Sequence, residues 1–249
     1  MHIYAIGDIH GHLGLLKAAH DLIADDIARH GPGPVIHLGD LVDRGPDSRG
    51  VIDFLIAGLD DGADWVVLKG NHDRMFARFL DDPWQPEPGL RVEFSWLHPR
   101  IGGAETLGAY GVDNAADRPV HKVHADAVRS VPQAHRTFLA ACPTLHLAGA
   151  CAFVHAGIRP GIALSDQAET DLVWIREPFL SHPHSHGPLI VHGHTAIARA
   201  THYGNRLNLD SSAAYGGPLS AVVITGTSSA LLTPSGRHPL VPVEVPPPA

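Results

Sequence analysis

The 249-residue sequence predicts an α/β fold in which parallel strands alternate with helices. Apolar runs rich in β-branched residues alternate with helically spaced apolar positions in the first third of the chain, and this alternation is typical of βαβ units. The 26 Gly and 21 Pro residues indicate many loops between these elements. A chain of this length is within the range that one domain can fill. We therefore expect a single loop-rich α/β domain over residues 1–240.

Three successive strand-loop-helix units account for the first third of the chain. The expected strands cover residues 2–6, 35–38 and 65–68. Apolar residues at helical spacing follow each strand and predict helices over residues 13–29, 48–59 and from about residue 73. Each strand also ends at a Gly-Asp or Gly-Asn pair. We therefore expect the loops after these strands to carry the chemistry of the protein.

The second half of the chain is expected to be mainly β. Periodicity fails over residues 81–103, where prolines and large aromatic residues predict an irregular insertion that could form a wall of the site. A helix is expected over 126–141, and strands over 145–147, 152–155, 189–192, 206–209 and 219–224 suggest a second sheet of hairpins. The proline-rich segment 241–249 is expected to be an extended tail, because proline cannot continue a central strand.

Composition and charge argue against several function classes. The formal net charge of -8 disfavours a surface for nucleic acid or anionic membranes, because clustered Lys and Arg hold such partners. No apolar run is long enough to span a bilayer, and the N-terminal residues do not have the pattern of an export signal. We therefore expect a cytoplasmic protein with no nucleic-acid or membrane partner. Cys142 and Cys151 are expected to be buried thiols.

Five short motifs place polar side chains directly after predicted strands. Three of them are Gly7-Asp-Ile-His-Gly11, Gly39-Asp-Leu-Val-Asp-Arg-Gly45 and Gly70-Asn-His-Asp73, and two later strand ends add one histidine each. The candidate side chains are Asp8, His10, Asp40, Asp43, Arg44, Asn71, His72, His155 and His194. Imidazole, carboxylate and amide ligands without thiolate suit Mn, Fe, Zn or Ni. A guanidinium in the same set can bind phosphate oxygens in a forked geometry.

In sequence order, the five motifs resemble those of the metal-dependent phosphoprotein phosphatases, a family within the calcineurin-like metallophosphoesterases, over roughly residues 1–225. The likeness is to the bacterial and phage serine/threonine type. It implies an α-β-β-α sandwich of two mixed sheets flanked by helices, with two divalent metals, preferably Mn, at the strand ends. The implied ligands are Asp8, His10, Asp40, Asn71, His155 and His194, with Asp40 as the bridge. His194 is preferred over His192 because the ligand follows the Gly of a Gly-His step.

The resemblance also implies catalytic roles. A hydroxide bridging the two metals would attack phosphorus in line. Arg44, Asn71 and Arg176, which lies in a Trp-x-Arg segment, would bind the phosphate. His72 resembles the general acid that protonates the departing alkoxide, and Asp43 resembles the carboxylate that orients and charges it.

Two residues beside these catalytic groups point to different substrates. At the motif position of Asp73, the symmetrical dinucleoside tetraphosphatases also have Asp, whereas the eukaryotic protein phosphatases have Glu. Asp43 points instead to phosphomonoesters, because the tetraphosphatases usually carry a small residue before the equivalent Arg. The leading hypothesis is a phosphoric monoester hydrolase acting on phosphoserine or phosphothreonine in proteins. The alternatives are a symmetrical dinucleoside tetraphosphate hydrolase and a non-catalytic phosphate-binding protein.

Other features are interpreted more simply. The histidine-rich run 181–187 is expected to be a solvated loop rather than a third metal site. Ser211 and Ser212 replace the Thr-Gly of the family pattern, so the nearby loop is expected to differ in shape. Related nucleases usually present a Gly-His-x-His motif. Here Thr195 and Ala196 follow His194 without a second histidine, so a nuclease is disfavoured. The sequence leaves the oligomeric state open.

Overall fold

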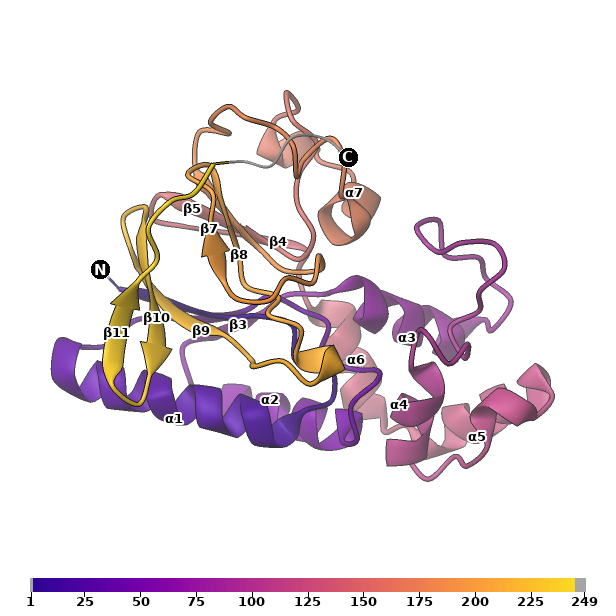
Figure 1. The fold of residues 1–249 in the computed structure, drawn as a ribbon. Coiled ribbons are helices and arrows are strands. Elements are labelled where there is room, and N and C mark those ends of the chain that lie inside the picture. Colours follow the sequence, from indigo (N-terminus) through magenta and orange to yellow (C-terminus); the bar gives the residue numbers. More distant parts are fainter. Residues whose placement is uncertain (1, 245–249) are drawn as a thin grey trace.

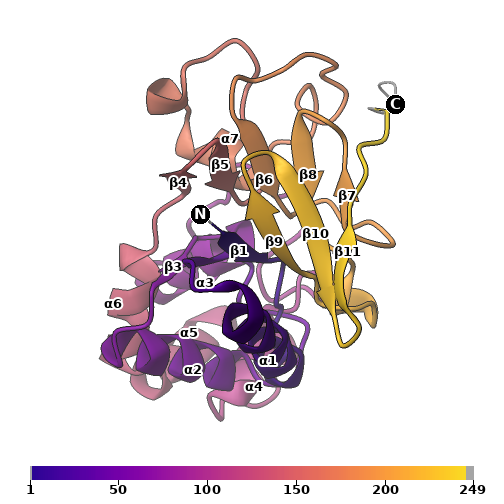
Figure 2. The same cartoon turned by 90° about the vertical axis from the view of Figure 1, so that its left-hand side faces the viewer.

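A computed structural model describes residues 2–244 and contains two mixed β-sheets flanked by helices (Figure 1). In the first sheet, β1 pairs in parallel with β2, and β2 with β3, whereas β9 and β10 pair antiparallel. Its strands, in spatial order, are β11 (Gly236–Pro239), β10 (Ser228–Thr233), β9 (Ala221–Thr225), β1 (Ile3–Ile6), β2 (Val35–His37) and β3 (Trp65–Val67). Figure 2 shows β9, β10 and β11 running side by side at one edge.

The second sheet has a parallel centre and antiparallel edges. β6 pairs in parallel with β5 and with β8, while β4 and β7 add antiparallel edge strands. In spatial order its strands are β4 (Leu145–Ala148), β5 (Cys151–Val154), β6 (Leu189–His192), β8 (Arg206–Asn208) and β7 (Thr201–His202). The strands that carry site residues at their ends therefore run in parallel within each sheet.

Helices cover both outer faces. Those over the first sheet are α1 (Leu13–His30), α2 (Ser48–Asp60), α3 (Asn71–Asp81), α4 (Gly103–Ala109), α5 (Val120–Ser130) and α6 (Gln133–Ala141). The short α7 (Glu169–Trp174) packs on the outer face of the second sheet. No helix within residues 2–244 is long and apolar enough to cross a membrane.

Three apolar clusters separate the four layers. Side chains alternate along a strand, so β1 sends Tyr4 and Ile6 to the cluster under the helices, and Ile3 and Ala5 to the cluster between the sheets. The third cluster joins β5 and β6 to α7. This α-β-β-α arrangement confirms the predicted fold class.

Several predicted elements need correction. The strand near 219–224 is β9, which pairs with β1 in the first sheet and not with the second. The second sheet is not a set of hairpins, because its central pairs are parallel. The helix expected over 126–141 is two helices, since Pro132 ends α5 and caps α6. The strands β7, β10 and β11 and the helices α4 and α7 were not predicted.

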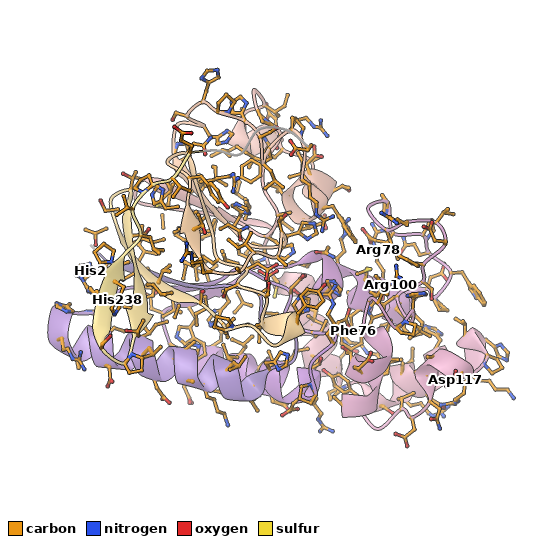
Figure 3. All side chains as sticks on the ribbon, viewed as in Figure 1. His2, Phe76, Arg78, Arg100, Asp117 and His238 are labelled. Carbon is orange, nitrogen blue, oxygen red and sulfur yellow. The ribbon has the colours of Figure 1, made fainter. Side chains whose placement is uncertain are left out.

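The expected insertion and tail are partly described. Residues 82–102 contain turns and no helix or strand. In Figure 3 the label of Arg100, which belongs to this segment, lies close to that of Arg78 in α3. Residues 241–244 have no regular structure, and residues 245–249 of the predicted tail lie outside the described part of the chain.

Candidate active site

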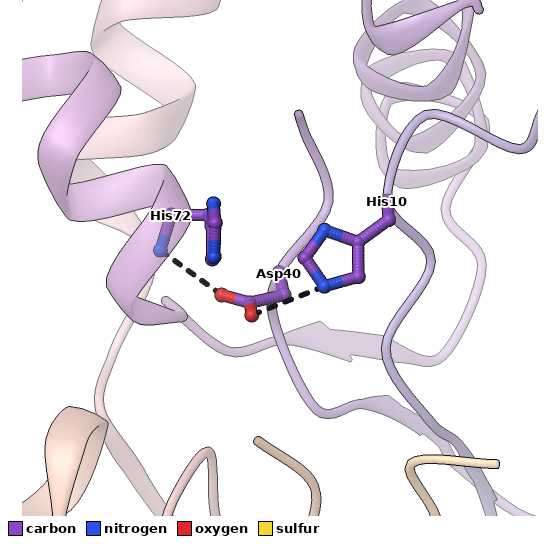
Figure 4. Close-up of side chains that lie close together, drawn as sticks. All are labelled: His10, Asp40 and His72. Carbon is purple, nitrogen blue, oxygen red and sulfur yellow. Dashed lines mark hydrogen bonds and ion pairs between the residues drawn. The ribbon is translucent and has the colours of Figure 1, made fainter. Parts of the chain in front are cut away.

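The predicted polar side chains converge where the ends of the central strands of both sheets meet. Two groups of possible metal ligands share Asp40, and within each group the ligand atoms lie within 4.8 Å of one another. One group, drawn in Figure 4, contains His10, Asp40 and His72, and the other contains Asp40, His155 and His194. All five residues are buried. A shared carboxylate between two ligand groups is the arrangement expected for a pair of bridged cations.

The backbone at these positions is strained. Seven non-glycine residues within 2–244 have positive φ, and five of them are His10, Asp40, Asp43, Arg44 and His194. Non-glycine residues in this region are costly and cluster at functional sites, where the surrounding fold holds them. The strain therefore coincides with the residues that the motifs predict.

Glycine allows the loops to approach each other closely. A Cβ at Gly193 would lie 1.8 Å from Asp8 Oδ1, so only glycine fits there. The backbone N–H of His194 donates to Asp8 Oδ2 at 2.9 Å. The first and fifth motifs are thus joined, although they are 186 residues apart.

The protonation of His155 indicates a cation site. Its Nδ1 lies 2.9 Å from Leu38 O and must donate to that carbonyl. Burial lowers the pKa of His155, which favours the neutral ring with a single proton. Nε2 then presents a lone pair to Asn71 Oδ1, 2.8 Å away. Two facing acceptors repel, whereas a divalent cation between them would be coordinated by both.

The same fit extends to the other ligand positions. His10 Nδ1 donates to Val42 O at 3.0 Å, so its Nε2 carries the lone pair; that lone pair accepts from Arg44 Nη1 at 2.8 Å and would turn to a cation when one binds. His194 Nδ1 lies 2.8 Å from Asn71 Oδ1, the oxygen that also faces His155 Nε2. Among residues 2–244, Asp8 Oδ1 is one of the buried side-chain atoms without a hydrogen-bond partner. Such atoms are costly unless a ligand satisfies them. The donor set therefore fits two divalent cations, and it does not distinguish Mn from Fe, Zn or Ni.

The charge of Asp40 is stabilised by its neighbours. Burial alone would raise its pKa, but the imidazoles around it, chiefly His155 and His72, hold the pKa well below its usual range. Burial, followed by repulsion from Asp210 and Asp40, raises the pKa of Asp8 instead. A cation bound beside Asp8 and Asp40 would stabilise the charged form of both carboxylates.

The Asp43 carboxylate is fully buried and holds His72 in place. His72 Nδ1 donates to Asp43 Oδ2 at 2.6 Å, and Trp96 Nε1 donates to the same oxygen at 2.9 Å. Thr106 Oγ1 donates to Asp43 Oδ1 at 2.7 Å. Arg44 Nη2 lies 3.0 Å from His72 Nε2, the nitrogen on the opposite side of the ring. The imidazole is thereby oriented with Nε2 toward the guanidinium of Arg44.

A cavity of about 190 Å³ opens over the ligand groups. Arg44 and Arg176 both line it, so two guanidinium groups face the same space. Its other lining residues include His10, Asp40, Asn71, His72, Trp174, His194, Asp210 and Tyr215. Forked guanidinium groups beside a cation site are suited to binding a phosphoryl group.

Two other residues named from the sequence, His192 and Asp73, do not face the cavity. His192 is outside both ligand groups: its Nδ1 lies 3.0 Å from Gly193 O and its Nε2 lies 3.3 Å from Arg206 Nη1. Asp73 does not line the cavity; it accepts the backbone N–H groups of Leu41 and Gly70 at 2.9 and 2.8 Å. Burial raises the pKa of Asp73 to about 7. Asp73 therefore joins two loops rather than contacting a substrate.

The histidine-rich run 181–187 forms a loop of turns and bends. The rings of His182 and His186 stack with centroids 4.9 Å apart. Neither of the two convergent ligand groups in residues 2–244 includes this loop.

Two cavity residues were missed from the sequence. Asp210 lies two residues after the end of β8, so the strand-end rule that found the candidate ligands could have found it. Burial raises its pKa to about 6. Tyr215 lies over Arg44, with its ring centroid 5.3 Å from the guanidinium carbon. No motif marks Tyr215, because its position depends on the short helical turn Ala213–Tyr215.

Comparisons with known proteins agree with this geometry. The family model for calcineurin-like phosphoesterases matches residues 1–225. The chain is 26% identical over 239 residues to the asymmetrical bis(5'-nucleosyl)-tetraphosphatase PrpE of Anoxybacillus flavithermus, which covers 87% of this chain and 88% of that protein.

Solved structures share the fold. One that is provisionally assigned as a diadenosine tetraphosphatase has a TM-score of 0.64 and 22% identity, covering 96% of this chain and 94% of that chain. A cold-active protein-tyrosine phosphatase from a psychrophilic Shewanella species has a TM-score of 0.58 and 17% identity, covering 96% and 80%. At these identities the likeness extends to the fold alone.

Proposed function

The chain belongs to the calcineurin-like phosphoesterase family, which makes it a phosphoester hydrolase, and we propose that its substrates are phosphomonoesters, chiefly phosphoserine and phosphothreonine in proteins. The observation that carries this proposal is the buried Asp43–His72 pair, whose second imidazole nitrogen, Nε2, lies 3.0 Å from Arg44 Nη2 beside the cavity. This pair bears on the substrate through the leaving group. An alkoxide is strongly basic, so cleavage of an alkyl phosphate is slow unless a general acid protonates the departing oxygen.

The proposed cation ligands divide around the shared carboxylate. Asp8, His10 and Asp40 would hold one divalent ion. Asp40, Asn71, His155 and His194 would hold the other, with Mn as the proposed metal. When bound, the two cations supply Lewis-acid polarisation of the phosphoryl oxygens and an activated water.

Arg44 and Arg176 would bind the phosphoryl oxygens. Both line the cavity, and a forked guanidinium can donate two parallel hydrogen bonds to phosphate. Arg44 lies between two site residues, since its Nη1 and Nη2 are 2.8 and 3.0 Å from the Nε2 atoms of His10 and His72. On binding of cations and a phosphoryl group, these donors would turn from the imidazoles to the phosphoryl oxygens, where they stabilise the charge that develops during transfer.

His72 would donate its Nε2 proton to the departing alkoxide. With Nδ1 held by the Asp43 carboxylate, a proton on Nε2 makes the ring an imidazolium, which the buried carboxylate stabilises. A serine or threonine alkoxide is strongly basic and needs this proton. A nucleotide leaving a polyphosphate is weakly basic and needs it less, so the pair favours monoesters of alcohols.

A second candidate is hydrolysis of dinucleoside tetraphosphates. It is favoured by Asp73 in the third motif and by the activity named for the Anoxybacillus relative. Symmetrical cleavage of diadenosine tetraphosphate would release two ADP, whereas asymmetrical cleavage would release ATP and AMP. The products of a single turnover therefore separate these two modes.

The experiment that tests the proposal is a substrate panel on protein stripped of metal and reconstituted with Mn. The panel includes phosphoserine, phosphothreonine and phosphotyrosine peptides and diadenosine tetraphosphate. We expect kcat/KM to be highest for the phosphoserine and phosphothreonine peptides. A higher value for the dinucleotide would overturn the proposed substrate class, and no turnover of any substrate would support a non-catalytic phosphate-binding protein.

A further inference from the structure

A buried glutamate joins the irregular segment 82–102 to the rest of the site. The side chain of Glu87 is 5% exposed, and its Oε1 accepts a hydrogen bond from Trp174 Nε1 at 2.7 Å. The same carboxylate forms ion pairs with Arg74 and Arg78 of α3, the latter at 3.5 Å. Glu87 therefore ties this segment both to α3 and to the end of α7.

Trp174 connects that anchor to the cavity. Its ring lies edge-to-face against the imidazole of His194, with centroids 5.7 Å apart and planes at 81°. Trp174 is the last residue of α7, and Arg176 follows two residues later and lines the same cavity. The position of the indole thus bears on both a proposed cation ligand and a proposed phosphate-binding guanidinium.

The backbone of the segment also packs directly on the indole. A Cβ at Gly89 would lie 2.2 Å from Cγ and Cδ2 of Trp174, which leaves no room for a side chain. Leu90 lines the cavity from the same segment. The indole is therefore held by the hydrogen bond that it donates to Glu87 and by direct contact with Gly89.

We propose that Glu87 is a positioning residue for phosphate binding: through Trp174 it fixes the segment that presents Arg176 to the cavity. Anchoring the backbone that carries Arg176 restricts where its guanidinium can reach, so less conformational entropy is lost when phosphate binds. This inference rests on the proposed role of Arg176. It assigns the segment 82–102 a function, as a rigid wall that orients the phosphate site.

The first test is Glu87→Gln, which replaces the charge-assisted hydrogen bond from Trp174 Nε1 with a weaker neutral one and removes both ion pairs with α3, so that the indole is held less firmly. We expect the Kd of the Mn-loaded protein for inorganic phosphate, measured by calorimetry, to rise about tenfold, because a charge-assisted contact from Arg176 is weakened. KM for a phosphomonoester should rise similarly, and kcat should change less. Glu93→Gln is the control, since Glu93 is an exposed carboxylate on the same segment and should leave Kd and KM unchanged.

A second variant, at Gly89, changes the packing against the Trp174 indole without altering any charge. Gly89→Ala should displace Trp174 and raise the phosphate Kd, again about tenfold. Gly14→Ala in α1 is its control, because a Cβ there meets nothing within 4 Å. The intrinsic fluorescence of Trp174, isolated by comparison with Trp174→Phe, should shift in Gly89→Ala and not in Gly14→Ala.

A purely structural role would give a different result. It would lower the melting temperature and the active fraction, and hence kcat, while leaving KM and the phosphate Kd unchanged; that outcome overturns the inference. The double variant Glu87→Gln/Arg176→Ala should bind phosphate no more weakly than Arg176→Ala alone, because both changes act on one contact. Additive losses would also overturn it. Because the phosphate Kd needs no turnover, the test remains decisive even if the substrate panel contradicts the proposed function.

Discussion

His72 Nδ1 donates a 2.6 Å hydrogen bond to Oδ2 of Asp43, a carboxylate that is completely buried. Trp96 and Thr106 donate to the same carboxylate, so three hydrogen bonds hold it in one orientation. The orientation matters because the other nitrogen of His72 then lies 3.0 Å from Arg44 Nη2, next to the cavity. The first prediction concerns the support of this carboxylate.

Thr106→Val should destabilise the protein by about 1–3 kcal/mol, because it leaves the Asp43 carboxylate oxygen and backbone N–H with fewer partners in a buried site. Urea unfolding measures the change. Thr137→Val is the matched control, since Thr137 lies on the exposed face of α6. Equal free energies of unfolding for the two variants would show that Thr106 does not support Asp43.

Arg44→Lys should lower kcat/KM by about 100-fold. A lysine cannot donate two parallel hydrogen bonds to phosphate in the planar geometry of a guanidinium. Steady-state kinetics on a phosphomonoester give the ratio, with the exposed Arg199→Lys as control. A loss below threefold would contradict the role of Arg44 in binding the phosphoryl group.

Removing the metals should lower the free energy of unfolding by about 3–4 kcal/mol for each of the two cations, relative to protein saturated with Mn at 100 to 1,000 times Kd. The reason is that Asp8 Oδ1 and the facing acceptors of His155 and Asn71 lose their partner. Unfolding with and without a chelator measures this difference. His155→Gln should reduce the bound Mn from two ions to about one per chain, whereas His146→Gln on β4 should not; unchanged metal content in His155→Gln would count against the site.

Stability should fall as the pH is lowered from 7 to 4.5, in part because of His20 and His37. Their Nε2 atoms lie 3.0 Å apart, and burial lowers the pKa of His20 to about 4 and that of His37 to about 3. Below about pH 6.5 the unfolded chain binds protons that the folded protein does not, so stability is lost as the pH falls.

The expected loss is on the order of 2 kcal/mol per imidazole at pH 4.5. Metal-free protein should be used, so that protonation of the cation ligands does not contribute through metal release. His20→Phe, which can pack beside Phe54 and Trp65, should reduce the slope of stability against pH. The same slope in His20→Phe and the unmodified protein would contradict this assignment.

The strand-end residues could be predicted from the sequence because they obey a local rule. A polar residue after a β-branched apolar run lies at the carboxyl end of a strand, and such ends meet in a parallel sheet. Asp8, Asp40 and Asn71 follow this rule in the first sheet, and His155 and His194 follow it in the second. One helix was expected over 126–141, although Pro132 is a sequence signal for the break between α5 and α6.

Contacts between distant segments could not be predicted in the same way. Trp96 reaches Asp43 across 53 positions, and Glu87 reaches Trp174 across 87. These pairs depend on the path of the irregular segment 82–102, which has no periodicity to read. The pairing of β9 with β1 likewise depends on which sheet edge remained open, which is a property of the whole fold.

The leaving-group dependence of Asp43→Asn tests the central claim most directly. The asparagine keeps the shape of the side chain but cannot stabilise a charged His72. Turnover of a phosphoserine peptide should fall by about 100- to 1,000-fold, whereas turnover of p-nitrophenyl phosphate, whose leaving group is weakly basic, should fall less than about tenfold. Asp60→Asn at the end of α2 is the control. Equal losses for both substrates would contradict the assignment of Asp43 and His72 to leaving-group protonation.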